Sequence, residues 1–139
     1  MTTEPAQRGT PFLHETMPFA RLLGLELEDD GPERVVLRAA WKPEFCTAQG
    51  ILHGGFLMAA VDTAGALCAF NNLPESAAGT TTIESKTNFL GAVRAGSVTI
   101  TAAPVHAGST TIVVQTDATD ERGRLISRSI QTQAVLYPR

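Results

Sequence analysis

The sequence predicts an α+β domain in which an antiparallel sheet of about six strands curves around one long helix. Two observations carry this prediction. The stretch 54–72 is long, apolar and rich in alanine, which is typical of a helix. The sequence from residue 79 onward consists of threonine- and valine-rich segments separated by short turns, which is typical of strands. One sheet with one enclosed helix is the economical packing of these elements.

Size and composition limit the classes of protein to consider. The 139 residues suit a single domain, 1–139, with a loose tail at residues 1–10. Hydrophobic residues make up 43% and charged residues 18%, which is the balance of a globular protein rather than a disordered one. The formal net charge is -3 and no run of basic residues occurs, so we expect no nucleic-acid partner.

The expected location is a reducing cytoplasm. Cys46 and Cys68 form neither a metal-binding spacing nor a disulfide framework. The N-terminal residues lack the pattern of a secretory signal. The apolar run 51–73 approaches membrane-spanning length, but it carries His53 and Asp62, which lipid would tolerate poorly. We therefore expect no membrane span.

The elements before the long helix can be placed from spacing and turn residues. Apolar residues around Pro18 predict one short helix or two helical turns that end near Gly24. Segment 25–41 alternates on both sides of the turn residues 29–32, which predicts a two-stranded hairpin. The long helix is apolar nearly all round, so we expect other elements to enclose it.

The remaining strands are separated by turn signals. These lie at 95–96, 107–108 and 121–123, and each indicates a short hairpin loop. Pro104 cannot donate a ladder hydrogen bond, so we expect it at a bulge or at an edge position.

Asp62 is a lone carboxylate in the middle of the apolar helix. An unpaired buried carboxylate costs several kcal/mol, so its presence needs a reason. It can bond to a neighbouring backbone group or face an exposed part of the helix. It can also be a catalytic general base or nucleophile whose basicity is raised by apolar surroundings. Because no neighbouring charge on the helix partners it, we favour the catalytic interpretation.

His53, Gly54 and Gly55 stand where the helix begins. Glycines leave the first amides of the helix bare and allow close approach of a ligand. Amides at the positive end of a helix dipole suit a carbonyl oxygen that becomes negative during a reaction. A tight turn against the sheet is the alternative explanation of the glycines. We expect His53 to orient the turn rather than to move protons.

The spacing of these residues has a consequence for assembly. Gly54 and Asp62 are eight residues apart, roughly 12 Å along a helix axis. A nucleophile and an oxyanion donor must both lie within about 3–3.5 Å of the same carbonyl group. One helix cannot do this alone. If both residues are catalytic, they must come from two subunits related by a two-fold axis, which predicts a homodimer with shared sites.

The stretches GILHGGFLMAAVDTAGALCA and TTTIESKTNFLGAVRAG make a family resemblance recognisable. The first resembles the helix motif of the hotdog-fold acyl-CoA thioesterases, in the branch of the phenylacetate-pathway thioesterase PaaI. The second resembles the strand and turn that follow it. The resemblance spans nearly the whole chain. It implies a curved sheet around a central helix, edge-to-edge dimers and commonly a dimer of dimers, a homotetramer.

The resemblance also implies roles for individual residues. Asp62 matches the catalytic carboxylate, and Gly54 matches the backbone N–H that polarises the thioester. Gly55 and His53 complete the motif. Thr82 falls where relatives often carry Ser or Thr to position the attacking water.

Two positions depart from the pattern of the family. Thr47 stands where many relatives have Asn to orient the thioester or water, and Gln49 is a nearby substitute. Gly91 stands where relatives often have Arg, which leaves Arg94 as the favoured cation for the phosphates of coenzyme A. Lys86 and Arg128 are further candidate cations.

The implied reaction is hydrolysis of an aryl- or medium-chain acyl-CoA to a free acid and coenzyme A, with no separate cofactor. The alternatives are a thioesterase acting on acyl carrier protein and a non-catalytic acyl-CoA-binding protein. The three histidines lack the spacing and partners of a metal site, so no metal is expected. Candidates for an acyl pocket are Phe56, Met58, Phe70 and Phe89.

Overall fold

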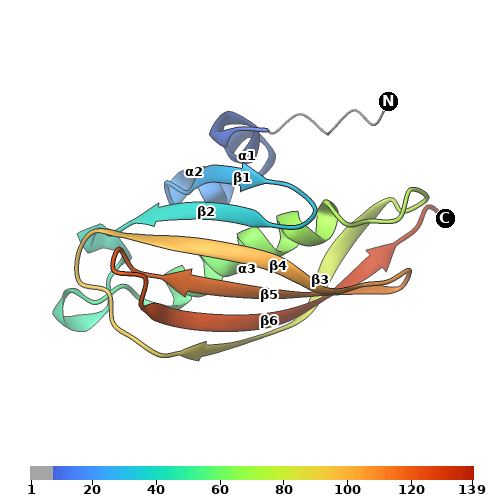
Figure 1. The fold of residues 1–139 in the computed structure, drawn as a ribbon. Helices are drawn as coiled ribbons and strands as arrows, with labels where there is room; N and C mark the ends of the chain where they lie inside the picture. Colours follow the sequence, from blue (N-terminus) through green and yellow to red (C-terminus); the bar gives the residue numbers. More distant parts are fainter. Residues whose placement is uncertain (1–7) are drawn as a thin grey trace.

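Six strands form one antiparallel sheet, and one long helix packs across a face of it (Figure 1). The computed structural model describes residues 8–139. The strand order in the sheet is β1-β2-β4-β5-β6-β3. The helices are α1 (Thr10–Thr16), α2 (Pro18–Leu22) and α3 (Gly54–Phe70). The strands are β1 (Glu26–Asp30), β2 (Val35–Ala40), β3 (Gly79–Phe89), β4 (Ser97–Ala107), β5 (Thr111–Thr119) and β6 (Leu125–Leu136). The expected α+β hotdog architecture is confirmed.

The core lies between α3 and the inner face of the sheet. Every second residue of β5 and of the first half of β4, residues 97–102, is buried, and both strands contact α3. Each fully buried aliphatic side chain contributes about 1.5–3 kcal/mol relative to an exposed one, so this alternation fixes which face of each strand meets the helix. Fully buried members include Val35, Leu37, Val98, Ile100, Ile112 and Val114.

The helix α3 is not enclosed on all sides, contrary to the expectation from its composition. Its buried side packs on the sheet, but Met58, Asp62 and Phe70 are exposed, with Ala59 and Ala66 half-buried beside them. Residues three and four apart share a helix face, so these five residues form one stripe along α3. We call them the exposed stripe. No helix within residues 8–139 is long and apolar enough to cross a membrane.

The strand β3 takes a different place from the one the turn signals indicate. The turn at 95–96 was expected to close a hairpin between β3 and β4, but β3 pairs antiparallel with β6, and β4 pairs with β2 and β5. Turn residues alone do not say which strands pair, because a turn can also begin a crossing to another part of the sheet. As a result β3 is an edge strand, and its outer side faces no other strand among the described residues.

The other local predictions agree with the structure. Two short helices precede β1, and β1 pairs with β2 as a hairpin. The register of β4 and β5 shifts between Pro104 and His106, so Pro104 lies at a bulge as expected. The loop 42–53 contains two 3-10 turns, Pro43–Phe45 and Ala48–Gly50.

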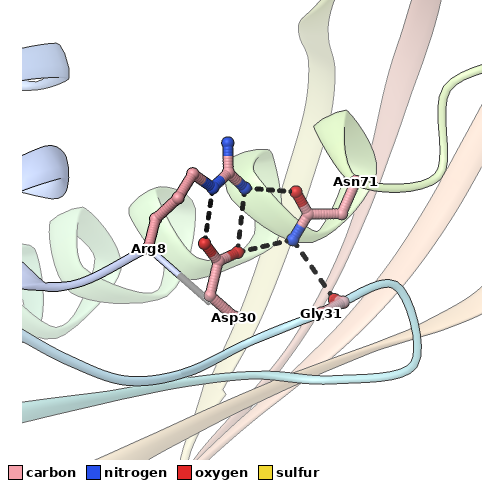
Figure 2. A network of polar contacts seen from close by, with 4 residues as sticks. All are labelled: Arg8, Asp30, Gly31 and Asn71. Carbon is pink, nitrogen blue, oxygen red and sulfur yellow. Dashed lines mark hydrogen bonds and ion pairs between the residues drawn. The ribbon is translucent and has the colours of Figure 1, made fainter. Parts of the chain in front are cut away.

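A polar network ties the chain near its N-terminus to the end of α3 (Figure 2). Arg8 donates to both carboxylate oxygens of Asp30, at 2.7 and 3.0 Å, and to Oδ1 of Asn71 at 2.6 Å. Asn71 in turn donates to Asp30 at 2.7 Å and to the carbonyl of Gly31 at 3.2 Å. Residues 8–10, expected in the loose tail, are therefore held by specific contacts. The rest of the expected tail, 1–7, lies outside the described residues.

Replacing Arg8 with Ala should lower the free energy of unfolding by about 1–2 kcal/mol, because the buried carboxylate of Asp30 loses two charge-assisted hydrogen bonds and keeps only Asn71. Urea unfolding followed by circular dichroism measures this change. Arg34→Ala is the matched control, since Arg34 pairs with Asp29 at an exposed position and should cost less than about 1 kcal/mol. Equal losses in both variants would contradict the account of the network.

Candidate functional site

The carboxylate of Asp62 is held by one of its two oxygens. Oδ1 accepts hydrogen bonds from the hydroxyl of Thr82 at 3.3 Å and from Nε2 of Gln131 at 3.2 Å. Oδ2 has no hydrogen-bond donor among residues 8–139. Asp62 is exposed in the single chain, so it lies on an exposed part of the helix, which was one of the two positions considered for it. The arrangement fixes one oxygen and leaves the other free to react.

The hydroxyl of Thr82 is directed toward Asp62 by Gln133. Nε2 of Gln133 donates to Oγ1 of Thr82 at 2.6 Å. The hydroxyl of Thr80 lies 3.2 Å from Oε1 of Gln133 and 2.9 Å from the carbonyl of Ala134, so these two acceptors share its single hydrogen. A hydroxyl carries one hydrogen, so Thr82 accepts from Gln133 and gives its own hydrogen to Asp62. This chain of hydrogen bonds brings Thr82 and Asp62 together, as the sequence predicts.

The side chain of Gln131 fills the space above Gly65. It is fully buried, and its Oε1 has no hydrogen-bond partner among the described residues. A Cβ added at Gly65 would lie 1.9 Å from that oxygen, so any larger residue at position 65 would require the amide of Gln131 to move. Neither Gln131 nor Gln133 is predicted as a site residue from the sequence. Their signal is a row of polar residues on the buried face of β6, at Ser127, Ser129, Gln131 and Gln133.

The first turn of α3 presents a bare amide. Nδ1 of His53 accepts from the N–H of Gly55 at 2.7 Å, so His53 caps the helix and orients the turn as expected. The N–H of Gly54 has no acceptor among residues 8–139. A Cβ at Gly54 would lie 3.1 Å from Cζ of Phe89, so the ring of Phe89 lies directly against this glycine. An unpaired amide at the positive end of a helix dipole suits a developing oxyanion.

Thr47 and Gln49 lie in the loop that leads into this turn. The N–H of Thr47 donates to the carbonyl of Ile51 at 2.8 Å, and the N–H of His53 donates to the carbonyl of Phe45 at 2.8 Å. Gln49 has a φ of 64°, a left-handed conformation that is uncommon outside glycine. Both side chains are exposed, and neither contacts Asp62 through a hydrogen bond in the described chain. Their predicted substrate-binding roles stay predictions.

Arg94 lines a surface pocket of about 570 Å³ together with residues of the turn between β5 and β6. The carbonyl of Val93 accepts from the N–H of Leu52 at 2.9 Å, so the pocket is joined to the segment just before His53. Asp120 in the same pocket is held by the N–H of Arg124, which lowers the pKa of its carboxyl group.

The two other candidate cations have partners of their own. Arg128 forms a two-pronged ion pair with Asp117, at 2.8 Å for both contacts, and Lys86 donates to Asn88 at 2.5 Å. Arg94 is therefore the best placed of the three cations for an anionic ligand.

The four candidates for an acyl pocket divide into two groups. Phe56 is buried and stacks on Phe45 with 4.4 Å between ring centroids, so it belongs to the core. Phe70 lies at the far end of α3, 6.0 Å from the guanidinium of Arg8. Phe89 of β3 is exposed and lies against Gly54, and Met58 is exposed one helical turn beyond Gly54 on α3.

Among residues 8–139, no group of three or more His, Cys, Asp or Glu side chains is placed to hold a metal ion. Cys46 and Cys68 are both unpaired. Burial raises the pKa of the Cys68 thiol to about 11, so it stays protonated at neutral pH and is a poor nucleophile. The reactive groups of the site are therefore the carboxylate and the backbone amide.

The carboxylate and the bare amide do not meet within one chain. Asp62 contacts Thr82 and Gln131, whereas Gly54 lies against Phe89. The eight helical residues between them correspond to about 12 Å along α3. A single carbonyl carbon cannot contact both groups at this separation. If both groups are catalytic, they must therefore come from two subunits, as the spacing in the sequence also predicts.

Comparisons with known proteins show the family and the fold of this chain. Residues 49–127 match the family described as Thioesterase superfamily. "Putative esterase ComA2" of Bacillus subtilis is 37% identical over 116 residues, which cover 82% of this chain and 90% of that protein. A thioesterase family protein of Silicibacter pomeroyi superposes with a TM-score of 0.84 at 26% identity, over 93% of this chain and 96% of that one. The E. coli PaaI protein shares the fold, with a TM-score of 0.81 at 20% identity over 91% and 89% of the two chains.

Replacing His53 with Ala should destabilise the fold by about 1 kcal/mol, because the N–H of Gly55 loses its cap. His53→Asn, which keeps a side-chain acceptor, should restore most of the loss. Thermal and urea unfolding of the three proteins measure the effect. If Ala and Asn destabilise equally, the cap is not what His53 contributes.

Proposed function

The chain belongs to the thioesterase superfamily and is a thioester hydrolase, and we propose that it cleaves acyl-CoA thioesters to a free acid and coenzyme A. The observation that carries the proposal is the carboxylate of Asp62, which has one held oxygen and one free oxygen on the exposed stripe of α3. The bare amide of Gly54 at the start of the same helix supplies the matching oxyanion donor.

The proposed active unit is a homodimer with two equal sites. Three features of the single chain support it: the unpaired outer edge of β3, the exposed stripe of α3, and Ile83, which is 64% exposed on β3. A long unpaired edge with exposed apolar side chains is a template for pairing with another strand. A second copy that adds its β3 to this edge completes the sheet and covers the stripe. The pairing of dimers into tetramers stays a prediction of the family resemblance.

The position of the two-fold axis follows from the neighbours of the two groups. In one chain Thr82 lies at Asp62, and Phe89 lies at Gly54. In an antiparallel pair of β3 strands, Thr82 must face the region of Phe89 of the partner subunit for Asp62 to meet Gly54 of the partner subunit. The midpoint of this pairing falls near Ser85 and Lys86. We propose that the axis passes between the two β3 strands there.

The reaction in this site begins with polarisation of the thioester carbonyl by the Gly54 N–H. In the general-base route, Oδ2 of Asp62 takes a proton from water while the water oxygen bonds to the carbonyl carbon. The tetrahedral intermediate then breaks its C–S bond, and the thiolate takes the proton from Asp62. In the nucleophilic route, Oδ2 itself bonds to the carbonyl carbon and displaces the thiolate, and water then cleaves the anhydride. In ¹⁸O-labelled water, label in Asp62 after a single turnover demonstrates the nucleophilic route with water attack at the Asp62 carbon of the anhydride, whereas attack at the acyl carbon labels the product acid in both routes.

The proposed substrate has an apolar acyl group and a coenzyme A carrier. Met58 and Phe89 offer apolar surface beside the Gly54 amide, which suits an aryl or medium-chain acyl group. The pocket at Arg94 adjoins the segment before His53, because Val93 in its lining accepts a hydrogen bond from the N–H of Leu52. The guanidinium of Arg94 suits the phosphates of coenzyme A. The two unpaired thiols are compatible with the reducing cytoplasm that we propose as its location.

Replacing Asp62 with Asn should lower kcat for acyl-CoA hydrolysis by about 10²–10⁴-fold, because the amide cannot act as base or nucleophile. Thiol release from a panel of aryl- and fatty-acyl-CoA thioesters measures the rate, and light scattering shows whether the dimer is intact. Equal rates for the wild type and the variant would remove Asp62 from the mechanism. A wild type that binds acyl-CoA without hydrolysing it would indicate a binding protein instead.

Replacing Arg94 with Ala should raise KM for acyl-CoA by up to about fivefold and leave kcat unchanged, since an exposed charge pair contributes about 1 kcal/mol or less. Steady-state kinetics on the same acyl group as an N-acetylcysteamine thioester, which lacks the phosphates, should show no change. Arg21→Ala on α2 is the matched surface control. A KM that rises equally for both thioesters would argue against Arg94 as a phosphate contact.

A further inference from the structure

We propose that Gln131 and Gln133 of β6 are positioning residues, which together fix the carboxylate of Asp62 so that Oδ2 is the reacting oxygen. This inference rests on the proposed function, since it concerns how that carboxylate is aimed. Neither glutamine touches the position of a substrate carbonyl. Both act through Asp62, one directly and the other through Thr82.

The register of the sheet places both amides beneath the site. Gln131 pairs with Ser85 and Gln133 pairs with Thr82 across the β3–β6 ladder. Residues two apart on a strand point to the same face, so both side chains point toward the side where α3 lies. Gln131 reaches Asp62 on α3, and Gln133 reaches Thr82 on β3. The carboxylate is thus contacted from two strands.

The two donors converge on one oxygen from different directions. A carboxylate on an exposed helix face rotates freely about its side-chain bonds when nothing holds it. Two hydrogen bonds to Oδ1, from Thr82 and Gln131, restrict that rotation and leave Oδ2 as the unoccupied oxygen. Gln133 donates a hydrogen bond to the oxygen of the Thr82 hydroxyl, so the hydrogen of that hydroxyl points toward Asp62.

The burial of Gln131 indicates that stability does not explain its presence. The side chain is fully buried, and its Oε1 has no acceptor role in the described chain. A buried polar atom without a partner is destabilising, so an apolar side chain of the same length would suit the core better. In addition, position 65 must be glycine, at the centre of a helix, to leave room for the amide. These two losses of stability are offset by the hydrogen bond from the Gln131 amide to Asp62, which positions the carboxylate.

Gln131→Met and Gln133→Met test the inference, because Met keeps the length of the side chain and removes the donor. Each should lower kcat about tenfold or more, with KM within about twofold, as expected for loss of a hydrogen bond to a charged group. Unfolding temperatures should stay equal or rise. Gln115→Met, on the outer face of β5, is the matched control and should change none of these.

A double-mutant cycle with Gly65 gives an independent test. In the wild type, Gly65→Ala should lower kcat as much as Gln131→Met does, because the new methyl group displaces the amide from Asp62. In a Gln131→Ala background the same Gly65→Ala change should have almost no further effect on kcat.

Two results would overturn the inference: an unchanged kcat in Gln131→Met, or an equal effect of Gly65→Ala in both backgrounds. The failure of the proposed function is distinguishable from these, since it would appear as Asp62→Asn hydrolysing at the rate of the wild type.

Discussion

The fixed rise of a helix is the constraint on which the rest of this structure depends. Gly54 and Asp62 stand on one rigid element, about 12 Å apart, so neither can complete a site with the other. The N-terminal end of α3 from a second copy must therefore lie next to Asp62, and Asp62 is exposed in the single chain. Asp62 belongs to the exposed stripe of α3 and contacts Thr82 of the edge strand β3, and these are the surfaces that a second copy would cover.

In the same region, two positions of α3 are occupied by glycine, which stabilises a helix less than alanine does but allows close contacts. Gly54 brings the ring of Phe89 close to a bare amide, and Gly65 makes room for a buried glutamine. Glycine weakens a helix interior by about 1 kcal/mol relative to alanine. The core elsewhere is made of well-packed aliphatic residues, whereas the inner face of β6 carries polar ones. Four of the buried polar side chains, Ser127, Ser129, Gln131 and Gln133, lie on β6, the strand that supports Asp62 and Thr82.

The sequence predicts the elements well because its local signals are strong. The helix from Gly54, the first hairpin and the bulge at Pro104 follow from spacing and turn chemistry. The crossing of β3 to β6 is not local, and no turn residue records it. Gln131 and Gln133 were missed because polar residues on a strand normally indicate the solvent face. Arg8 was placed in a tail because its partners, Asp30 and Asn71, are distant in the sequence.

Subunit complementation tests the shared site most directly. Asp62→Asn removes the carboxylate, and Gly54→Pro removes the amide hydrogen at the first helical position, where proline is tolerated. Gly54→Ala, which keeps the N–H, controls for the added side chain. Each inactive variant alone should stay inactive, but a refolded one-to-one mixture should recover about a quarter of wild-type activity, since half of its dimers carry one intact site. A mixture that stays as inactive as the separate variants would contradict the shared site.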